Sequence, residues 1–313
     1  MPESAVPNEE LTHFPPSSIK LIAEKTGILC RRVAREEECT SDLAIRAARR
    51  CLQKIDFPAE QLQGIVLSTS SPDRMQPATA TRVQHELGAL NAFAFDINSV
   101  CSGSTFGICM VDALIKSGRF DNIMFIASEM YSKILHKRDF ATFPIFGDGA
   151  GAILFRAGNS NRGVYHSCLK TDGSSSNAIC VPAGGTMLPF EKMSNPRMAH
   201  FKMNGTVVFE FATNKGTEII LKLLGEAGVA VHDVDWFVTH QANINIIEGI
   251  ASRLGVVKGK FPVNLDRYGN TASASVLVTL DEAISDNMIR EGDLVVTSAF
   301  GGGLSWGANL IRI

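Results

Sequence analysis

A cysteine, a histidine and an asparagine stand at turns where they could act together on a carbonyl compound. Cys101 lies in the sequence VCSG, between a short apolar run and a segment whose apolar residues have helical spacing. A thiol there faces the unpaired amides and the positive end of a helix, both of which favour the thiolate. Cys101 is therefore a candidate nucleophile. A buried structural cysteine is the commoner fate of a single Cys, but small residues on both sides leave room for a substrate.

His240 and Asn270 are the candidate partners of this thiol. His240 follows a strongly apolar strand in the sequence THQAN, and its imidazole could act as a base or donate a hydrogen bond to developing negative charge. Asn270, in YGNTA, offers a neutral donor that suits an enolate. A structural turn capped by Asn has the same composition, so from this residue alone both interpretations stay open.

Two glycine-rich segments also invite a functional interpretation. The sequence FGDGAGA at 146–152 does not predict a phosphate loop, because no Lys followed by Ser or Thr comes next and the following element is a strand. The sequence FGGG at 300–303 follows the last strand, where glycines let the backbone approach a ligand closely. One of its amides could complete an oxyanion hole, although a plain tight turn is the alternative.

Helices and short apolar strands alternate along the chain, which is typical of the α/β class. The first block consists of a helix at 41–54, a strand at 65–67, a helix that ends at 88, a strand at 93–97, a helix that ends at 117 and a strand at 123–127. A second block repeats this order about 170 residues later. It consists of a helix at 216–226, a strand at 236–238, a helix that ends at 255, a strand at 261–265, a helix that ends at 290 and a strand at 294–296.

This order predicts an internal duplication of two halves rich in βαβ units, 1–160 and 161–313, with chance similarity of two α/β segments as the alternative. When the two halves are aligned, Cys101 and Asn270 fall in corresponding turns from strand to helix. His240 falls in the loop after a strand of the second half. Loops at the carboxyl ends of strands are where α/β folds place function.

The composition excludes several classes of protein. Of 313 residues 45% are hydrophobic, and the formal charge is only -2, so no basic surface is expected to bind nucleic acid. The chain has no secretory start and no uncharged apolar run of about 18 residues, so we expect a cytoplasmic protein without a membrane span. Seven scattered cysteines without a CxxC pair argue against a disulfide framework or a zinc knuckle, and we expect most of them to be reduced and buried. We expect no metal and no cofactor.

Taken together and in order, the motifs resemble the β-ketoacyl-acyl-carrier-protein synthase III family from about residue 26 to the C-terminus. The motifs that carry the likeness are Cys101, GDGAGA, HQAN at 240–243, GNT at 269–271 and FGGGLSWG at 300–307. The resemblance implies a thiolase-like fold of two similar halves, layered α-β-α-β-α, and a homodimer.

The resemblance also implies a reaction. Cys101 would take an acyl group from acyl-CoA or another acyl thioester, and His240 with Asn270 would stabilise the enolate left when malonyl-acyl carrier protein loses carbon dioxide. The amides of Cys101 and Gly302 would form the oxyanion hole, and Phe300 would position the catalytic groups. By the same likeness the side chains that contact substrate would be Lys25, Arg32 and Asn243.

The chain departs from the family pattern at three places. Family members usually begin with a further strand of about ten residues, and Met1 and Pro2 stand where that strand would end, so either the start is misplaced or the edge of the first half is altered. Leu21 and Phe140 stand where acyl-CoA users hold the adenine with Trp and Arg, so we expect the nucleotide end of coenzyme A to contribute little to binding. Two positions that are basic on the surface facing the carrier protein are Glu210 and Asn245 here.

Three alternatives to an initiating condensing enzyme remain. A relative of the alkylquinolone or polyketide-starter type would use the same three residues. A thioesterase or peptidase with a Cys-His pair would also need a thiolate and an imidazole, but Asn270 in the matched turn favours an enolate. A carrier-binding module without activity would not require Cys101, His240 and Asn270 together.

Overall fold

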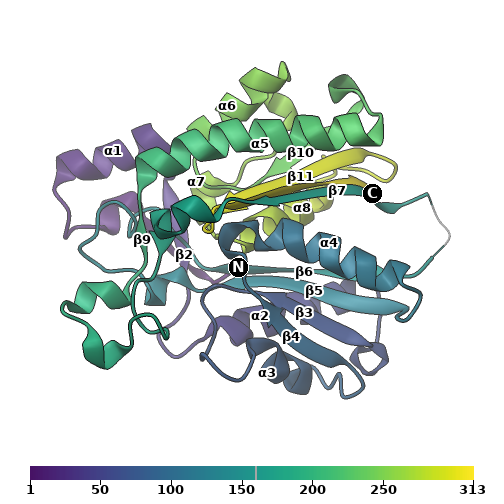
Figure 1. Ribbon diagram of the computed structural model, residues 1–313, viewed down its shortest axis with the longest axis horizontal. Coiled ribbons are helices and arrows are strands. Elements are labelled where there is room, and N and C mark those ends of the chain that lie inside the picture. The colour runs from purple at the N-terminus through teal and green to yellow at the C-terminus, as the bar shows by residue number, and fades with distance from the viewer. Residues whose placement is uncertain (159–160) are drawn as a thin grey trace.

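The computed structural model describes residues 1–158 and 161–313 and contains two four-stranded sheets (Figure 1). The first sheet has the strand order β4-β3-β5-β6, formed by β4 (Phe93–Ile97), β3 (Gly64–Ser68), β5 (Asn122–Glu129) and β6 (Gly149–Arg156). The second has the order β10-β11-β12-β7, formed by β10 (Trp236–Thr239), β11 (Leu294–Gly301), β12 (Ser305–Arg312) and β7 (Gly163–Thr171). In the first sheet β4, β3 and β5 are parallel and β6 is antiparallel to β5. In the second sheet β10 and β11 are parallel, whereas β12 is antiparallel to both β11 and β7.

Helices separate and cover the two sheets, so the molecule has five layers (Figure 1). The outer face of the first sheet carries α2 (Thr40–Lys54) and α3 (Thr79–Glu86). Between the sheets lie α4 (Gly103–Lys116) and α8 (Ala274–Ser285). The second sheet is covered by α5 (Gly205–Ala227), with α6 (Ile244–Leu254) beside it. The layered α-β-α-β-α architecture that the resemblance implies is confirmed.

Smaller elements border the layers. They are β1 (Ser4–Pro7), which pairs with β2 (Cys30–Val33), α1 (Pro16–Thr26), α7 (Leu265–Tyr268), and the short pair β8 (Ile179–Cys180) and β9 (Lys202–Met203). No helix among the described residues combines the length and the apolar composition needed to cross a membrane.

The central helices are apolar on two sides because each meets a sheet on either side. Ile108 of α4 and Leu277 of α8 belong to one buried cluster with Val66 of the first sheet and Ile311 of the second. Strands β3 and β5 are buried at every residue, which explains their continuous apolar runs in the sequence. The core between the sheets is therefore shared by both halves of the chain.

Corresponding elements recur at a constant spacing. Strand β3 begins at Gly64 and β10 at Trp236, a separation of 172 residues. Strand β5 begins at Asn122 and β11 at Leu294, and each has eight residues. The predicted boundary at 160 falls on a residue outside the described ranges.

Two expected elements differ from the structure. The strand predicted at 261–265 is wrong: Phe261 stacks on Phe237 with ring centroids 5.0 Å apart, and Leu265 begins α7. The apolar run there reflects a buried loop of the second core rather than a strand. Helix α5 begins eleven residues before the predicted 216, because Asn204 caps it by accepting a hydrogen bond from the Val207 amide at 3.3 Å.

The cysteines follow the prediction in part. All seven are free, as expected. Only Cys101 and Cys168 are buried, whereas the other five are half-buried, so the expectation that most are buried is wrong.

The outer edge of the first sheet borders an open groove. Strand β1 pairs with β2 and not with β6, and among the described residues no strand lies along the outer edge of β6. A groove of about 710 Å³ runs there between α2 and α8, lined by Ala150, Gly151 and Ala152 of β6. In the second sheet β7 occupies the corresponding place beside β12.

Candidate active site

The candidate nucleophile lies in a turn with an unusual backbone conformation. Cys101 belongs to a single helical turn, Val100–Ser102, that leads into α4. Val100 has φ of 48°, a left-handed value that is costly for a β-branched residue. The Asn98 side chain supports this turn, because its Oδ1 accepts a hydrogen bond from the Val100 amide at 3.1 Å. The strained turn holds Cys101 at the entrance of α4.

The second half repeats this turn at Asn270. The Asn270 Oδ1 accepts a hydrogen bond from the Ala272 amide at 2.9 Å, and Ala272 has φ of 46°. With the 172-residue spacing of the strands, Val100 corresponds to Ala272 and Asn98 to Asn270. The two turns are thus equivalent, as predicted, but the residue that matches Asn270 is Asn98 and not Cys101. Because Asn270 uses its oxygen for the turn, its Nδ2 amide group is left to donate elsewhere.

The GDGAGA segment supports the Asn270 turn. The Asn270 amide donates to the Ile145 carbonyl at 2.9 Å, and the Gly147 amide donates to the Asn270 carbonyl at 3.0 Å. A Cβ at Gly147 would lie only 2.2 Å from the Tyr268 carbonyl oxygen, so this position requires glycine. The segment packs backbone against backbone.

His240 is buried and neutral. It follows β10, and its Nδ1 lies 2.7 Å from the Ser275 Oγ of α8. The Gln241 amide donates to the same Oγ at 3.3 Å. Among the described residues Ser275 Oγ has no other partner, so its proton is directed at Nδ1 of His240 and the imidazole proton then resides on Nε2. Burial lowers the pKa of His240 to about 3, so the ring carries no charge near neutral pH.

His240 and Cys101 both lie against the carboxyl end of β11. Phe300 contacts the His240 ring edge to face, with centroids 5.4 Å apart. The next residue, Gly301, approaches the nucleophile: a Cβ there would lie 2.7 Å from the Cys101 amide nitrogen. Cys101 shares a buried cluster with Ala272 of the Asn270 turn. Sequence reasoning singled out Phe300 and Gly302 but missed Gly301, whose signal was its place directly before Gly302.

Sequence reasoning also missed a buried carboxyl group. Glu129, at the end of β5, is fully buried, and burial raises its pKa. Its carboxyl accepts hydrogen bonds from the hydroxyls of Ser71 at 2.6 Å and of Ser273 at 2.7 Å, so it joins a loop of the first half to the Asn270 turn. The only signal in the sequence was an acidic residue ending an apolar strand.

The resting state of Cys101 differs from the expectation. Burial raises the pKa of the Cys101 thiol above its ordinary value, and the nearby Glu129 raises it further. Loss of hydration therefore opposes the helix end that was expected to favour the thiolate. The resting side chain is a protonated thiol.

Two of the three side chains predicted to contact substrate, Asn243 and Arg32, bind other parts of the chain. Asn243 caps α6 by accepting from the Asn245 amide at 2.8 Å, and its Nδ2 donates to the Lys25 carbonyl at 3.0 Å. The Lys25 side chain is exposed. The Arg32 guanidinium donates to the Glu3 carbonyl at 2.8 Å and lies over the Tyr268 ring. A role of these side chains in substrate binding stays a prediction.

Known proteins are similar to this chain over its whole length. The chain matches the family model of 3-oxoacyl-[acyl-carrier-protein] synthase III at residues 95–173 and its C-terminal model at residues 224–313. It is 40% identical to the β-ketoacyl-[acyl-carrier-protein] synthase III of Symbiobacterium thermophilum, over all of this chain and 95% of that relative. The chain belongs to the 3-oxoacyl-[acyl-carrier-protein] synthase III family. The resemblance read from the sequence is confirmed, and with it the class of enzyme, a condensing acyltransferase.

Solved structures of related synthases have the same fold. The synthase III of Aquifex aeolicus VF5 superposes with a TM-score of 0.92 at 32% identity, covering 100% of this chain and 97% of that one. The priming β-ketosynthase of the R1128 polyketide pathway superposes with a TM-score of 0.91 at 27% identity, covering 99% and 93%. The thiolase-like fold is therefore confirmed for this synthase III family member.

Proposed function

We propose that the protein joins an acyl group, carried first on Cys101, to the enolate of a malonyl thioester. The observation that carries the proposal is that a buried thiol and a neutral imidazole both lie against the carboxyl end of β11, while the thiol packs in one cluster with the turn that orients the Asn270 amide. The neutral imidazole and the amide suit a reaction that creates negative charge on an enolate oxygen, because both can donate hydrogen bonds to it.

The first half-reaction acylates Cys101. The Sγ attacks the thioester carbonyl, and the amides of Cys101 and Gly302 hold the oxyanion of the tetrahedral intermediate. When the intermediate collapses, the acyl group stays on Sγ and the leaving thiolate takes up the proton that Cys101 loses. The raised pKa of Cys101 favours loss of this proton during the reaction rather than before it.

The second half-reaction forms the carbon-carbon bond. Loss of carbon dioxide from the malonyl thioester leaves an enolate, whose oxygen accepts hydrogen bonds from Nε2 of His240 and Nδ2 of Asn270. The enolate carbon attacks the acyl carbonyl on Cys101. The Cys101 thiolate leaves and takes up a proton from solvent, which restores the resting thiol, and the product is a β-ketoacyl thioester. Phe300 keeps the imidazole in place by packing against its ring.

The partners of the reaction follow from the same proposal. Acyl-CoA or another acyl thioester supplies the primer, and malonyl-acyl carrier protein supplies the extender in fatty-acid synthesis. We propose that the enzyme acts as a homodimer in the cytoplasm. Leu21 and Phe140 are both exposed apolar side chains, which supports recognition of the acyl chain and pantetheine rather than the adenine of coenzyme A.

A starter-unit synthase of a specialised pathway is the second candidate. Glu210 of α5 and Asn245 of α6 are exposed where housekeeping relatives are basic, which would change the carrier protein that is accepted. The similarity to the R1128 priming enzyme supports this alternative. Both candidates share the chemistry at Cys101.

Mass spectrometry of the acylated enzyme tests the proposal. After exposure to acyl-CoA or an acyl-pantetheine thioester, we expect one acyl group on the peptide that contains Cys101, and none in Cys101→Ser. Cys109→Ser, a second cysteine of the same region in α4, is the matched control and should acylate like the wild type. Acylation of Cys101→Ser at another cysteine would overturn the assignment. Similar rates with both thioesters would support the proposed recognition of pantetheine.

A further inference from the structure

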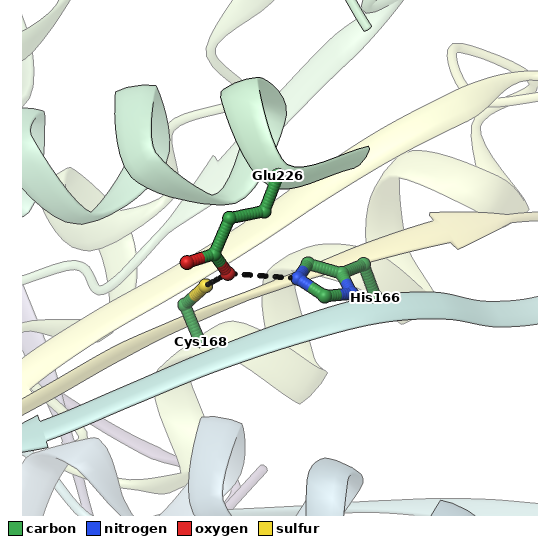
Figure 2. A group of neighbouring side chains, drawn as sticks. All are labelled: His166, Cys168 and Glu226. Atoms are coloured by element: carbon green, nitrogen blue, oxygen red, sulfur yellow. Dashed lines mark hydrogen bonds and ion pairs between the residues drawn. The ribbon is translucent and has the colours of Figure 1, made fainter. Parts of the chain in front are cut away.

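A cluster of three side chains outside the active site has the composition of a metal site. His166 and Cys168 of β7 and Glu226 of α5 each place one ligand atom within 4.8 Å of the other two. Figure 2 shows the imidazole and the thiol, both from the strand, turned toward the carboxylate of the helix. Nothing in the proposed reaction uses these residues.

The donors meet at one carboxylate oxygen. His166 Nε2 lies 2.9 Å from Oε2 of Glu226, and Cys168 Sγ lies 3.0 Å from the same atom. The other oxygen, Oε1, accepts a hydrogen bond from Lys222. An ion bound through Oε2 would therefore leave the contact with Lys222 in place.

The strand is irregular in a way that brings the two β7 ligands to the helix. His166 pairs with Leu310 and Val164 with Ile311, so β7 has an extra residue, Tyr165, between them. Because of this bulge Val164 packs into the core between the sheets, whereas Cys168 packs into the core under α5. His166 and Cys168, two residues apart in regular strand, share the face that α5 covers.

We propose that His166, Cys168 and Glu226 bind a divalent ion of the zinc class, with water as the fourth ligand. Mixed nitrogen, sulfur and oxygen donors select zinc and similar ions over magnesium or calcium, which prefer oxygen alone. With metal-ligand bonds of about 2.0 to 2.3 Å, the ligand atoms of a tetrahedral site stand roughly 3.3 to 3.8 Å apart. The two hydrogen bonds to Oε2 would open by less than about 1 Å to admit the ion.

The site is accessible from one side. Cys168 is buried, whereas the side chains of His166 and Glu226 are 37% and 41% exposed. Solvent can thus supply the ion and its water. The thiol binds as a thiolate and releases its proton on binding. The bound ion would tie β7 to the last turn of α5.

Cobalt(II) is the probe, because a thiolate bound to cobalt gives a charge-transfer absorption band in the near ultraviolet. We expect the intact protein to bind one equivalent of Co²⁺ with this band, and excess Zn²⁺ to remove the band by displacement. Cys168→Ser should lose the band, and His166→Ala and Glu226→Gln should each weaken ion affinity about tenfold or more. Serine and glutamine keep the size of the replaced side chains, so these variants should fold.

Two controls decide whether the band belongs to this site. The double variant Cys180→Ser with His232→Ala removes one thiol and one imidazole elsewhere, and should bind Co²⁺ like the wild type. Zn²⁺ should raise the melting temperature of the wild type but not of Cys168→Ser. A band that persists in Cys168→Ser, or the absence of any band in the wild type, would overturn the proposal and leave a hydrogen-bonded cluster. Neither result bears on acylation of Cys101, which is measured separately.

Discussion

Asn270 has two roles in the proposed reaction, whereas its counterpart Asn98 has one. Both side chains brace a turn through Oδ1, but only Nδ2 of Asn270 is assigned to the enolate. We expect Asn270→Ala to slow malonyl decarboxylation about 10²-fold or more and to spare acylation of Cys101. Asn98→Ala loses a comparable turn hydrogen bond, roughly 1 kcal/mol of unfolding free energy, and should keep most of the decarboxylation rate.

The comparison uses separate assays of decarboxylation and acylation, with urea unfolding of each variant. If the two alanine variants lost decarboxylation to the same extent, Asn270 would be a structural residue only. Asn270→Asp retains the acceptor for the Ala272 amide and removes the donor, so it should behave like Asn270→Ala in decarboxylation.

The burial of His240 predicts a dependence of stability on pH. Its pKa is about 3 in the folded protein and near 6.5 in an unfolded chain, so between these values the unfolded state binds more protons. The stability contributed by the neutral ring is complete above about pH 6.5 and decreases toward pH 3, by at most roughly 1.4 kcal/mol per pH unit. Urea unfolding at pH 7 and pH 5 should show a larger loss for the wild type than for His240→Gln. An equal loss in both proteins would contradict the assignment.

At the scale of the element, substitution of two glycines near the C-terminal end of helix α5 should change the unfolding free energy in opposite directions. Gly228 ends the helix with φ of 67°, and Gly225 lies within the helix; a Cβ at either position would meet no atom within 4 Å. Gly228→Ala should lower the unfolding free energy by about 1 kcal/mol, because only the backbone conformation is disfavoured. Gly225→Ala should raise it by up to about 1 kcal/mol, since alanine is the better helix former. Denaturant titration of the two variants measures both, and effects of the same sign would contradict the conformational argument.

At the scale of the whole molecule, the shared central layer predicts that the two halves unfold together. Ile108 of α4 is fully buried in the cluster that both sheets share. Ile108→Ala should cost about 2 to 5 kcal/mol and shift one cooperative transition. Both tryptophans, Trp236 and Trp306, lie in the second sheet, so their fluorescence reports on the half that does not contain residue 108.

The measurement compares tryptophan fluorescence with far-ultraviolet circular dichroism during urea unfolding. The two transitions should coincide and shift equally in Ile108→Ala. A fluorescence transition that stayed in place while the other moved would show that the halves unfold independently. Ile284→Ala, an isoleucine on the exposed side of α8, is the control and should change the unfolding free energy by less than about 1 kcal/mol.

The local pattern of the sequence was sufficient for most of the fold. The strand predicted at 93–97 agrees with β4, and the strands around 65, 123, 236 and 294 lie where the apolar runs predicted them. A local pattern was sufficient for the buried strands β3 and β5, because buried strands read as nearly continuous apolar runs. The division into halves at 160 stays a prediction, although the 172-residue spacing of the strands favours it.

Tertiary structure decided what depends on burial and on contacts distant in sequence. The apolar run at 261–265 is a buried loop because Phe237 packs against Phe261, which no local pattern encodes. The neutral state of His240 and the protonated state of Cys101 follow from loss of hydration, and a sequence does not specify hydration.

The equivalence of Asn98 and Asn270 became visible only through their hydrogen bonds, since both sequences simply read as turns. Glu226 lies 58 residues from Cys168, and only the packing of α5 on β7 brings them together. The sequence of this chain therefore determined most of its helices and strands and the types of its reactive residues. Folding decided their charge states and their partners, because these depend on which distant groups exclude water from each side chain.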